Sequence, residues 1–211
     1  SFSCFIAMPI TLNGNGTITG VAVGGLPDGI VDTDMLAANA VSSAKLASGA
    51  GGKILQVVQT VKTDKFSTTS FTSYTDIGPQ GSITASTAGN KIMVEIMLNV
   101  SCDNGRHIAF RLEKDGAAVS GAEGDAVGSN RKQGCFHLYS EDQNGKHNQT
   151  TLCLKYLDTA ADTNAHTYNI ACIDWGGQGT TQITCNSSEA DGDLSHESRT
   201  ISTVTLSEIV A

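Results

Sequence analysis

The chain has 211 residues, including 23 Gly and only 5% aromatic side chains, and its 13 Lys and Arg against 21 Asp and Glu give a formal net charge of −8. This acidic balance argues against a nucleic-acid-binding face, since phosphate backbones attract clustered cations and Arg131-Lys132 is the only such cluster. No apolar run approaches the ~20 residues of a membrane-spanning helix, so neither nucleic-acid binding nor membrane insertion is predicted.

The first 28 residues predict an extended attachment arm. The stretch is rich in Gly, Asn and Thr, and Asn13-Gly14 and Asn15-Gly16 are typical of tight turns. Its apolar beginning, residues 2–10, lacks the basic leader and the convincing cleavage site of a signal peptide. We therefore expect residues 1–28 to form an arm rather than an export signal.

Residues 29–51 predict a short helical connector that ends in a Gly-rich hinge. Asp32 or Thr33 can cap the helix. The small apolar side chains of one stripe are Leu36, Ala40, Ala44 and Ala47. A helix of this length is marginal alone, so the stripe is expected to pack either against copies of itself, with threefold symmetry, or against its own domain. The pattern leaves both alternatives open.

Residues 52–211 predict an all-β head, an antiparallel, jelly-roll-like β-sandwich. The clearest strand is 91–102, where apolar and polar residues alternate with the period of a strand that buries one face. Its buried face is predicted to comprise Ile92, Val94, Ile96, Leu98, Val100 and Cys102. The next strand, 106–114, is predicted to bury Ile108, Phe110 and Leu112 and to expose His107, Arg111 and Glu113.

Three hairpins are predicted within the head. In the first, a three-residue turn that ends at a left-handed Gly105 pairs Leu98 with Phe110 and keeps both apolar side chains on one face. The other two hairpins are predicted to join 134–140 to 150–157 and 166–175 to 180–186.

The first strand of the head is apolar on both faces. Leu55 and Val57 alternate with Ile54 and Val58. Such a strand is expected to be buried on both sides, by the sandwich core on one and by a subunit interface on the other. Together with the striped connector, this strand predicts a homotrimer.

Several short motifs follow one another in a fixed order. They lie at residues 8–29, 30–47, 52–60, 83–92, 110–116, 155–159, 166–168 and 200–209. In that order they resemble fibre- and spike-type virion structural proteins of tailed cyanophages and other marine phages. The resemblance implies a homotrimeric β-sandwich head on a particle-bound arm, assembled in the host cytoplasm. The connector is short, which leaves a stubby spike, a fibre tip or a capsid decoration open, and Met8, where the likeness begins, is an alternative start.

No catalytic, cofactor-binding or metal-binding residue is predicted. The six Cys have no CxxC spacing and are expected to be free thiols, including Cys172 and Cys185. The five His are scattered along the chain, and His107 and His137 are expected on the surface. The acidic stretch 189–197 offers oxygen ligands for Ca²⁺, but it lacks the closing bidentate Glu, so a solvated loop is favoured.

Trp175, the only Trp, is the candidate receptor contact. It precedes the Gly-rich stretch 176–179 at a predicted sheet end, where an aromatic ring can stack on a sugar. A core anchor beneath that loop is the favoured alternative. Other receptor contacts are expected on four loops, at 121–134, 141–149, 158–165 and 187–199.

These features predict a non-enzymatic virion protein, a homotrimeric phage fibre or spike that contributes to host adsorption. The expected partners are its own copies, other virion proteins bound through the arm, and a host surface glycan. The alternatives are a free trimeric lectin-like jelly roll or a capsid decoration protein. A depolymerase ranks third, because the sequence shows no cluster of carboxylates outside the acidic loop.

Overall fold

The computed structural model describes residues 11–12, 18–19, 36, 40–42, 45, 53–69, 72–103, 105–125, 128, 130–140, 147–174 and 182–211. The chain separates into two compact units, Ser1–Gly51 and Gly52–Ala211. In the first unit, β1 (Thr11–Leu12) and β2 (Ile18–Thr19) pair antiparallel. Most of the predicted connector helix lies outside the described residues, and positions 36, 40–42 and 45 are not α-helical. Among the described residues, no helix is long and apolar enough to cross a membrane.

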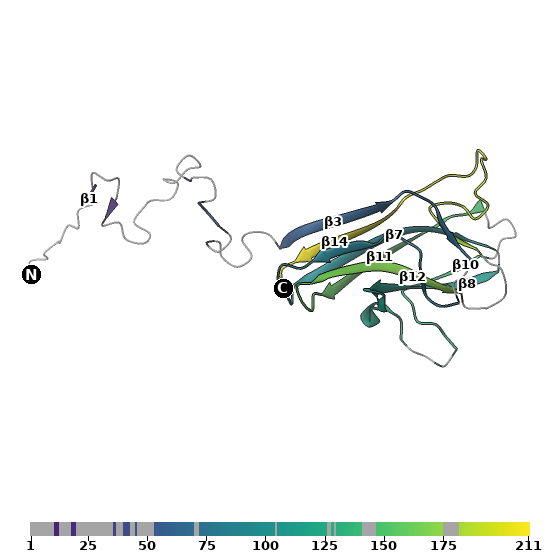
Figure 1. Ribbon diagram of the computed structural model, residues 1–211, viewed down its shortest axis with the longest axis horizontal. Coiled ribbons are helices and arrows are strands. Elements are labelled where there is room, and N and C mark those ends of the chain that lie inside the picture. The colour runs from purple at the N-terminus through teal and green to yellow at the C-terminus, as the bar shows by residue number, and fades with distance from the viewer. Residues whose placement is uncertain are drawn as a thin grey trace, which may run out of the picture. The chain divides into compact units, whose positions relative to one another are not determined.

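The second unit contains two antiparallel sheets that face each other across one core (Figure 1). The first sheet comprises β3 (Ile54–Lys62), β4 (Phe66–Thr68), β7 (Lys91–Cys102), β11 (Thr150–Thr159), β13 (Ile183–Cys185) and β14 (Ser202–Ile209). The second sheet comprises β5 (Thr75–Asp76), β6 (Gly81–Thr84), β8 (Arg106–Lys114), β9 (Ala117–Ala118), β10 (Phe136–Ser140) and β12 (Ala165–Asp174). Helical structure in the described residues of this unit is limited to 3₁₀ conformation, as in the turn η3 (Ser120–Ala122). The predicted all-β sandwich is therefore confirmed.

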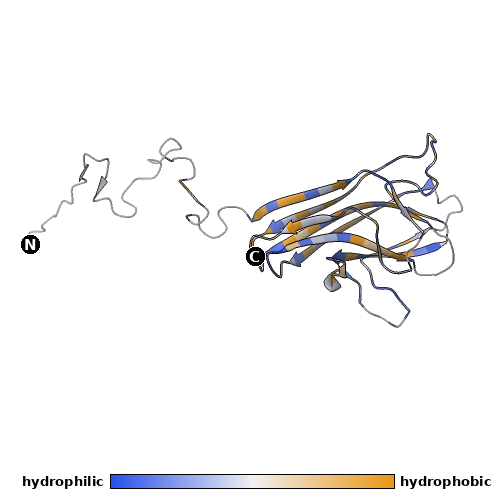
Figure 2. Cartoon of the chain, viewed as in Figure 1, coloured by the Kyte–Doolittle hydropathy of each residue, from blue (hydrophilic) through white to orange (hydrophobic). Residues whose placement is uncertain are grey.

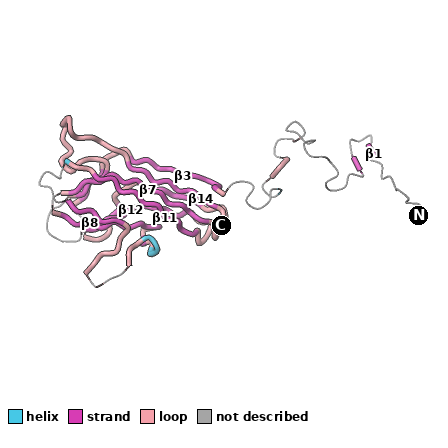
Figure 3. Tube along the Cα trace, turned by 180° about the vertical axis from the view of Figure 1, so that it is seen from behind, coloured by secondary structure: helices cyan, strands magenta, loops and turns pink. Residues whose placement is uncertain are grey.

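The short strands extend longer ones, so each sheet has four lines of strands. In the first sheet, β3 with β4 lies beside β14 with β13, followed by β7 and then β11. In the second sheet, β5 with β6 lies beside β12, followed by β8 and then β10 with β9. Figure 1 shows β3 and β14, from opposite ends of the unit, side by side, and Figure 3 shows the same neighbours from behind.

The three predicted hairpins are wrong. Strands β7 and β8 belong to different sheets, and so do β10 and β11, and β12 and β13. Leu98 pairs with Leu152, and Phe110 pairs with Phe136 and Cys172. Each connection crosses between the sheets because the apolar faces of both strands then meet in one core from opposite sides. Gly105 does adopt the left-handed conformation, with φ of 72°. It lies in a connection that crosses from one sheet to the other, however, and not in a hairpin turn.

The predicted buried faces are confirmed. All six apolar residues named for β7 are buried, as are Ile108, Phe110 and Leu112 of β8. They pack with Tyr168 of β12 in one cluster. Figure 2 shows the matching alternation of hydrophobic and hydrophilic residues along the strands. Alternation therefore identifies the core side of each strand even where the partner strand was assigned wrongly.

Glu113 departs from the prediction that it is exposed. It lies on the outer side of β8 but is only 4% exposed. Its carboxylate accepts a hydrogen bond from Arg111 Nε at 2.8 Å, and Asn169 Nδ2 lies 3.5 Å from its other oxygen. Tyr74 stacks on the Arg111 guanidinium at 3.7 Å. A polar network thus covers this part of the outer face.

The first strand, β3, is an edge strand. Val58 packs against the core on its inner side. On its outer side, Leu55, Val57 and Val61 are exposed, and 59% of Val57 is accessible to solvent. The expectation of burial on both sides is thus not met within a single chain.

The five described cysteines are free thiols, as predicted. Cys172 and Cys185 enter the same core from opposite sheets. Burial raises the pKa of Cys102 and Cys172 to about 12, which keeps both side chains as neutral thiols.

Candidate functional site

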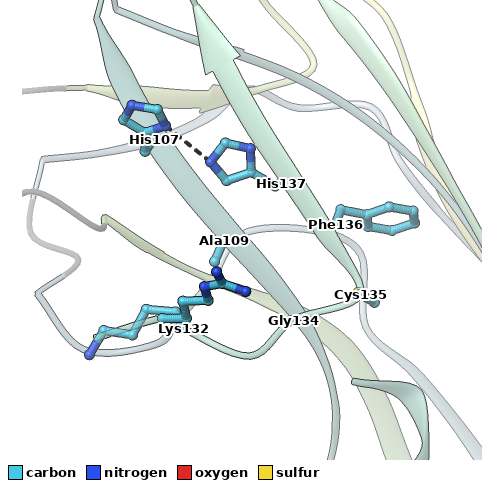
Figure 4. A pocket seen from close by; sticks show the side chains of 8 residues that line it. His107, Ala109, Lys132, Gly134, Cys135, Phe136 and His137 are labelled. Carbon is cyan, nitrogen blue, oxygen red and sulfur yellow. Dashed lines mark hydrogen bonds between the residues drawn. The ribbon is translucent and has the colours of Figure 1, made fainter. Parts of the chain in front are cut away.

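A pocket of about 540 Å³ lies at the β8–β10 edge of the second sheet. It is lined by His107, Ala109, Arg131, Lys132, Gly134, Cys135, Phe136 and His137. Figure 4 shows the two imidazole rings facing each other from neighbouring strands, while Lys132 extends away from them. We call these eight residues the β8–β10 pocket.

The register of the two strands places the histidines. Tyr139 pairs with His107 and His137 pairs with Ala109, so these residues share the outward face of antiparallel neighbours. The intervening Ile108 and Leu138 point to the core side. Local alternation therefore fixes the direction of both imidazoles.

The three rings form a stacked row. His107 Nδ1 lies 3.2 Å from His137 Nε2, within hydrogen-bonding distance. The His107 and Tyr139 rings are nearly parallel, with centroids 4.2 Å apart. Tyr139 and both histidines are exposed. Because the rings cover part of one another's faces, the row presents ring edges and its two outer ring faces at the pocket.

The segment that carries the two cations is fixed to the sheet by several contacts. Cys135 donates its backbone N–H to the Phe110 carbonyl oxygen at 2.7 Å. The preceding Gly134 lies so close to that oxygen that a Cβ atom would clash with it, so the close approach requires glycine. The side-chain amide of Gln133 donates to the Gly124 carbonyl oxygen at 2.9 Å, and the backbone carbonyl oxygen of Gln133 accepts a hydrogen bond from the Tyr74 hydroxyl. These contacts hold residues 131 and 132 at the rim.

The pocket is electropositive on a chain that is negative overall. Arg131 and Lys132 are exposed, and none of the described residues lining the pocket is acidic. Burial, followed by the proximity of His107, lowers the pKa of His137 below its ordinary value. At neutral pH the fixed positive charge therefore comes from Arg131 and Lys132.

Cys135 supplies the one thiol among the residues that line the pocket. Its thiol donates to the Phe110 carbonyl oxygen at 3.3 Å, and burial raises its pKa to about 11. A neutral, engaged thiol is a poor nucleophile. The arrangement is suited to binding an anionic ligand rather than to covalent chemistry.

The structure describes some of the predicted site residues and not others. Trp175 and residues 176–179 lie outside the described residues, as does most of the loop at 141–149. The loop at 121–134 supplies both cations of the pocket. His107 and His137 are exposed as predicted, but their contact was missed. The signal that could have revealed it was the pairing of residues 106–110 with 136–140.

Comparisons with known proteins leave the family of this chain open. No family model matches it, and no curated protein sequence matches it either. A chain in a structure titled "Structure of infectious bursal disease virus Gx strain" is similar over 74% of this chain and 36% of its own length. The sequence identity is 15% and the TM-score is 0.29. This chain thus spans little more than a third of that one, and a likeness at this TM-score defines neither a function nor an assembly.

Proposed function

We propose that this chain is a non-enzymatic structural protein of a virus particle, a homotrimeric fibre or spike whose sandwich contributes to host adsorption by binding an anionic glycan. The main support for this proposal is the β8–β10 pocket. There the stacked row of two histidines and a tyrosine lies beside the cations Arg131 and Lys132. Flat rings stack on sugar faces. Arginine and lysine bind carboxylate or sulfate groups.

The strand order supports the structural part of the proposal. The eight lines of strands are numbered here by their order along the chain. Across the first sheet, β3, β14, β7 and β11 are then the first, eighth, third and sixth lines. Across the second sheet, β5 with β6, then β12, β8 and β10 are the second, seventh, fourth and fifth lines. This is the order expected for a jelly roll of two Greek keys, an architecture used in viral capsid and lectin domains. The ordered motifs that resemble phage fibre proteins favour the virion.

The exposed edge of the first sheet supports self-association. An edge strand is unpaired along one side, and one that exposes apolar side chains is a liability unless another surface covers it. Leu55, Val57 and Val61 form such an edge on β3. We assign this edge to contact between copies of the chain, and light scattering of the purified protein should give three chain masses.

Two other functions compete with this one. A free lectin-like jelly roll would use the same pocket, and a reconstruction of the intact virus particle that shows density for this sandwich would separate the two. A depolymerase needs paired carboxylates in a groove. Asp76 and Glu113 meet through Asn169, whose Nδ2 lies 2.6 Å from Asp76 and 3.5 Å from Glu113. Neither carboxylate lines the β8–β10 pocket, so the binding function is preferred.

The test of the glycan proposal is a binding titration. Heparin and a uronic acid polymer serve as anionic probes, and dextran serves as the neutral control. We expect salt-sensitive binding of the anionic probes, weakened about tenfold by the double substitution Arg131→Ala/Lys132→Ala, because both cations line the pocket. Lys53→Ala removes an exposed cation outside the pocket and should leave binding unchanged. Equal binding of dextran, or unchanged binding by the double variant, contradicts the proposal.

A further inference from the structure

A second group of histidines lies outside the β8–β10 pocket. His147 lies three residues before the start of β11, whereas His196 and Glu197 belong to the loop that leads to β14. The potential ligand atoms of the three side chains all lie within 4.8 Å of one another. His147 Nδ1 is 2.6 Å from Glu197 Oε1, and the rings of His147 and His196 meet edge to face with centroids 5.3 Å apart.

The carboxylate of this group is held in place by its own loop. The Glu197 side chain is only 4% exposed. Its Oε2 accepts a hydrogen bond from Ser188 Oγ at 3.0 Å and another from the backbone N–H of Gly192. Those two bonds leave Oε1 directed at His147. An orienting shell of this kind is what metal-binding carboxylates require.

The two segments that carry the group are clamped together beside it. Gln149 donates to the Ser198 carbonyl oxygen at 2.8 Å and accepts from Thr200 Oγ1 at 2.7 Å. The neighbouring Asp191 is engaged by Lys65 and Arg199, so its carboxylate is neutralised by its own partners. The loop at 187–199 is therefore an ordered network, in contrast to the solvated loop favoured by its composition.

The charges of the group suit a cation. Glu197 offers a carboxylate oxygen, and His147 and His196 each offer an imidazole nitrogen. Two imidazoles with one carboxylate are typical of borderline transition metals, whereas Ca²⁺ and Mg²⁺ prefer all-oxygen sites.

We propose that His147, His196 and Glu197 bind a divalent transition-metal ion of the Zn²⁺ class. The ion takes the place of the hydrogen bond between His147 and Glu197 and draws the exposed His196 inward. Three protein ligands leave a fourth position for water. Bound there, the ion joins the segment before β11 to the loop before β14 and stiffens this end of the sandwich. The sequence analysis considered 189–197 only as a possible Ca²⁺ loop and did not include His147, because His147 and Glu197 lie 50 residues apart in the chain.

The experiment uses the full chain, freed of metal with a chelator and titrated at pH 7.5 with Zn²⁺ by calorimetry and with Co²⁺ by visible absorption. We expect one ion per chain, intense Co²⁺ bands typical of a tetrahedral site, and a higher Tm with Zn²⁺. His196→Ala should weaken binding at least tenfold and remove the Tm shift. Because His196 is exposed and its ring makes no core contact, this variant should keep the fold and the metal-free Tm.

The matched control is His137→Ala, which removes an exposed histidine from the other histidine pair. It should bind Zn²⁺ like the native chain. Loss of binding in His137→Ala but not in His196→Ala would overturn the proposal, as would the absence of binding at micromolar Zn²⁺. Glu197→Gln gives a second test through its carboxylate, and unchanged Co²⁺ bands in that variant would also contradict the assignment.

Discussion

The outer faces of the two sheets differ in chemistry although the same core lies beneath both. The first sheet exposes aliphatic side chains at its edges, including Leu55 and Val57 on β3 and Leu157 on β11. The second sheet exposes a row of rings beside two cations, with the Arg111–Glu113 network next to it. An aliphatic edge is stabilised by burial against another surface, whereas a polar, ring-lined pocket is suited to a small or flexible ligand. This difference is the basis for proposing self-association at one face and recognition at the other.

The largest expected effect comes from placing a charge on the aliphatic edge. Val57→Lys puts an ammonium group where we propose that a second copy packs, and burying an unpaired charge is prohibitively costly. Light scattering should show the native mass of three chains falling to one. Tyr139→Lys places the same charge on the other face, at another exposed side chain, and should leave the mass unchanged. Dissociation of the Tyr139 variant alone would reverse the assignment of the two faces.

A substitution in the core beneath both faces should lower the stability of the fold without altering either face. Phe110 is fully buried between the sheets. Phe110→Ala should lower the free energy of unfolding by roughly 3–5 kcal/mol, the usual range for a buried aromatic. Chemical denaturation measures the loss. A cost below about 1 kcal/mol would place Phe110 outside the core.

Glu208 tests whether the first sheet is held by polar contacts at its end. This carboxylate is fully buried on β14, and it accepts hydrogen bonds from Asn90 at 2.7 Å, Ser86 at 2.7 Å and Gln56 at 2.7 Å. Glu208→Ala leaves the buried amide of Asn90 without its acceptor and also removes the acceptor of Ser86 and Gln56, so it should cost roughly 1–3 kcal/mol. Denaturation at pH 7 gives the loss, and Lys53→Ala, at the exposed start of β3, serves as the near-neutral control.

The same residue predicts a pH dependence. Burial favours the neutral acid, but the hydrogen bonds from Asn90, Ser86 and Gln56 outweigh it and lower the pKa of Glu208 from 4.5 to about 2. A folded-state pKa below the unfolded value stabilises the protein above pH 4.5, and this stabilisation is lost as the pH falls from about 4.5 to about 2. Thermal denaturation across that window should show a smaller decline in Glu208→Ala than in the native chain. An equal decline in both would assign acid lability to other groups.

The smallest effect on stability is expected at the pocket rim. Arg131 and Lys132 are exposed, so their joint replacement by Ala should change the free energy of unfolding by only about 0.5 kcal/mol. Binding of an anionic glycan should nevertheless fall about tenfold. A variant that loses stability together with binding would indicate a structural role for the rim.

The side chains that each strand buries could be predicted from the sequence, whereas the pairing of the strands could not. Alternation along residues 91–102 and 106–114 predicted which side chains are buried, because one strand alone decides its faces. It could not predict the partner strands, since a crossing and a hairpin bury the same side chains. Hairpin reasoning therefore failed at all three connections.

The candidate sites were less predictable for the same reason. His107 and His137 meet only because β8 pairs with β10, and His147 meets Glu197 only because two distant loops share one end of the sandwich. Glu113 reads as an exposed charge, yet Arg111 two residues earlier provides the partner that lets it be buried. Trp175, the residue that the sequence singled out, lies outside the described residues.

Hydrogen–deuterium exchange of the full chain, with and without heparin, can test both proposals at once: self-association at β3 and glycan binding at the β8–β10 pocket. If another copy covers the edge of β3, as proposed, the outer amides of this strand should already be protected in the free protein. Residues 131–140 should gain protection only when heparin is added. Rapid exchange along the outer edge of β3, together with heparin protection that falls on β3 instead of β10, would contradict both proposals.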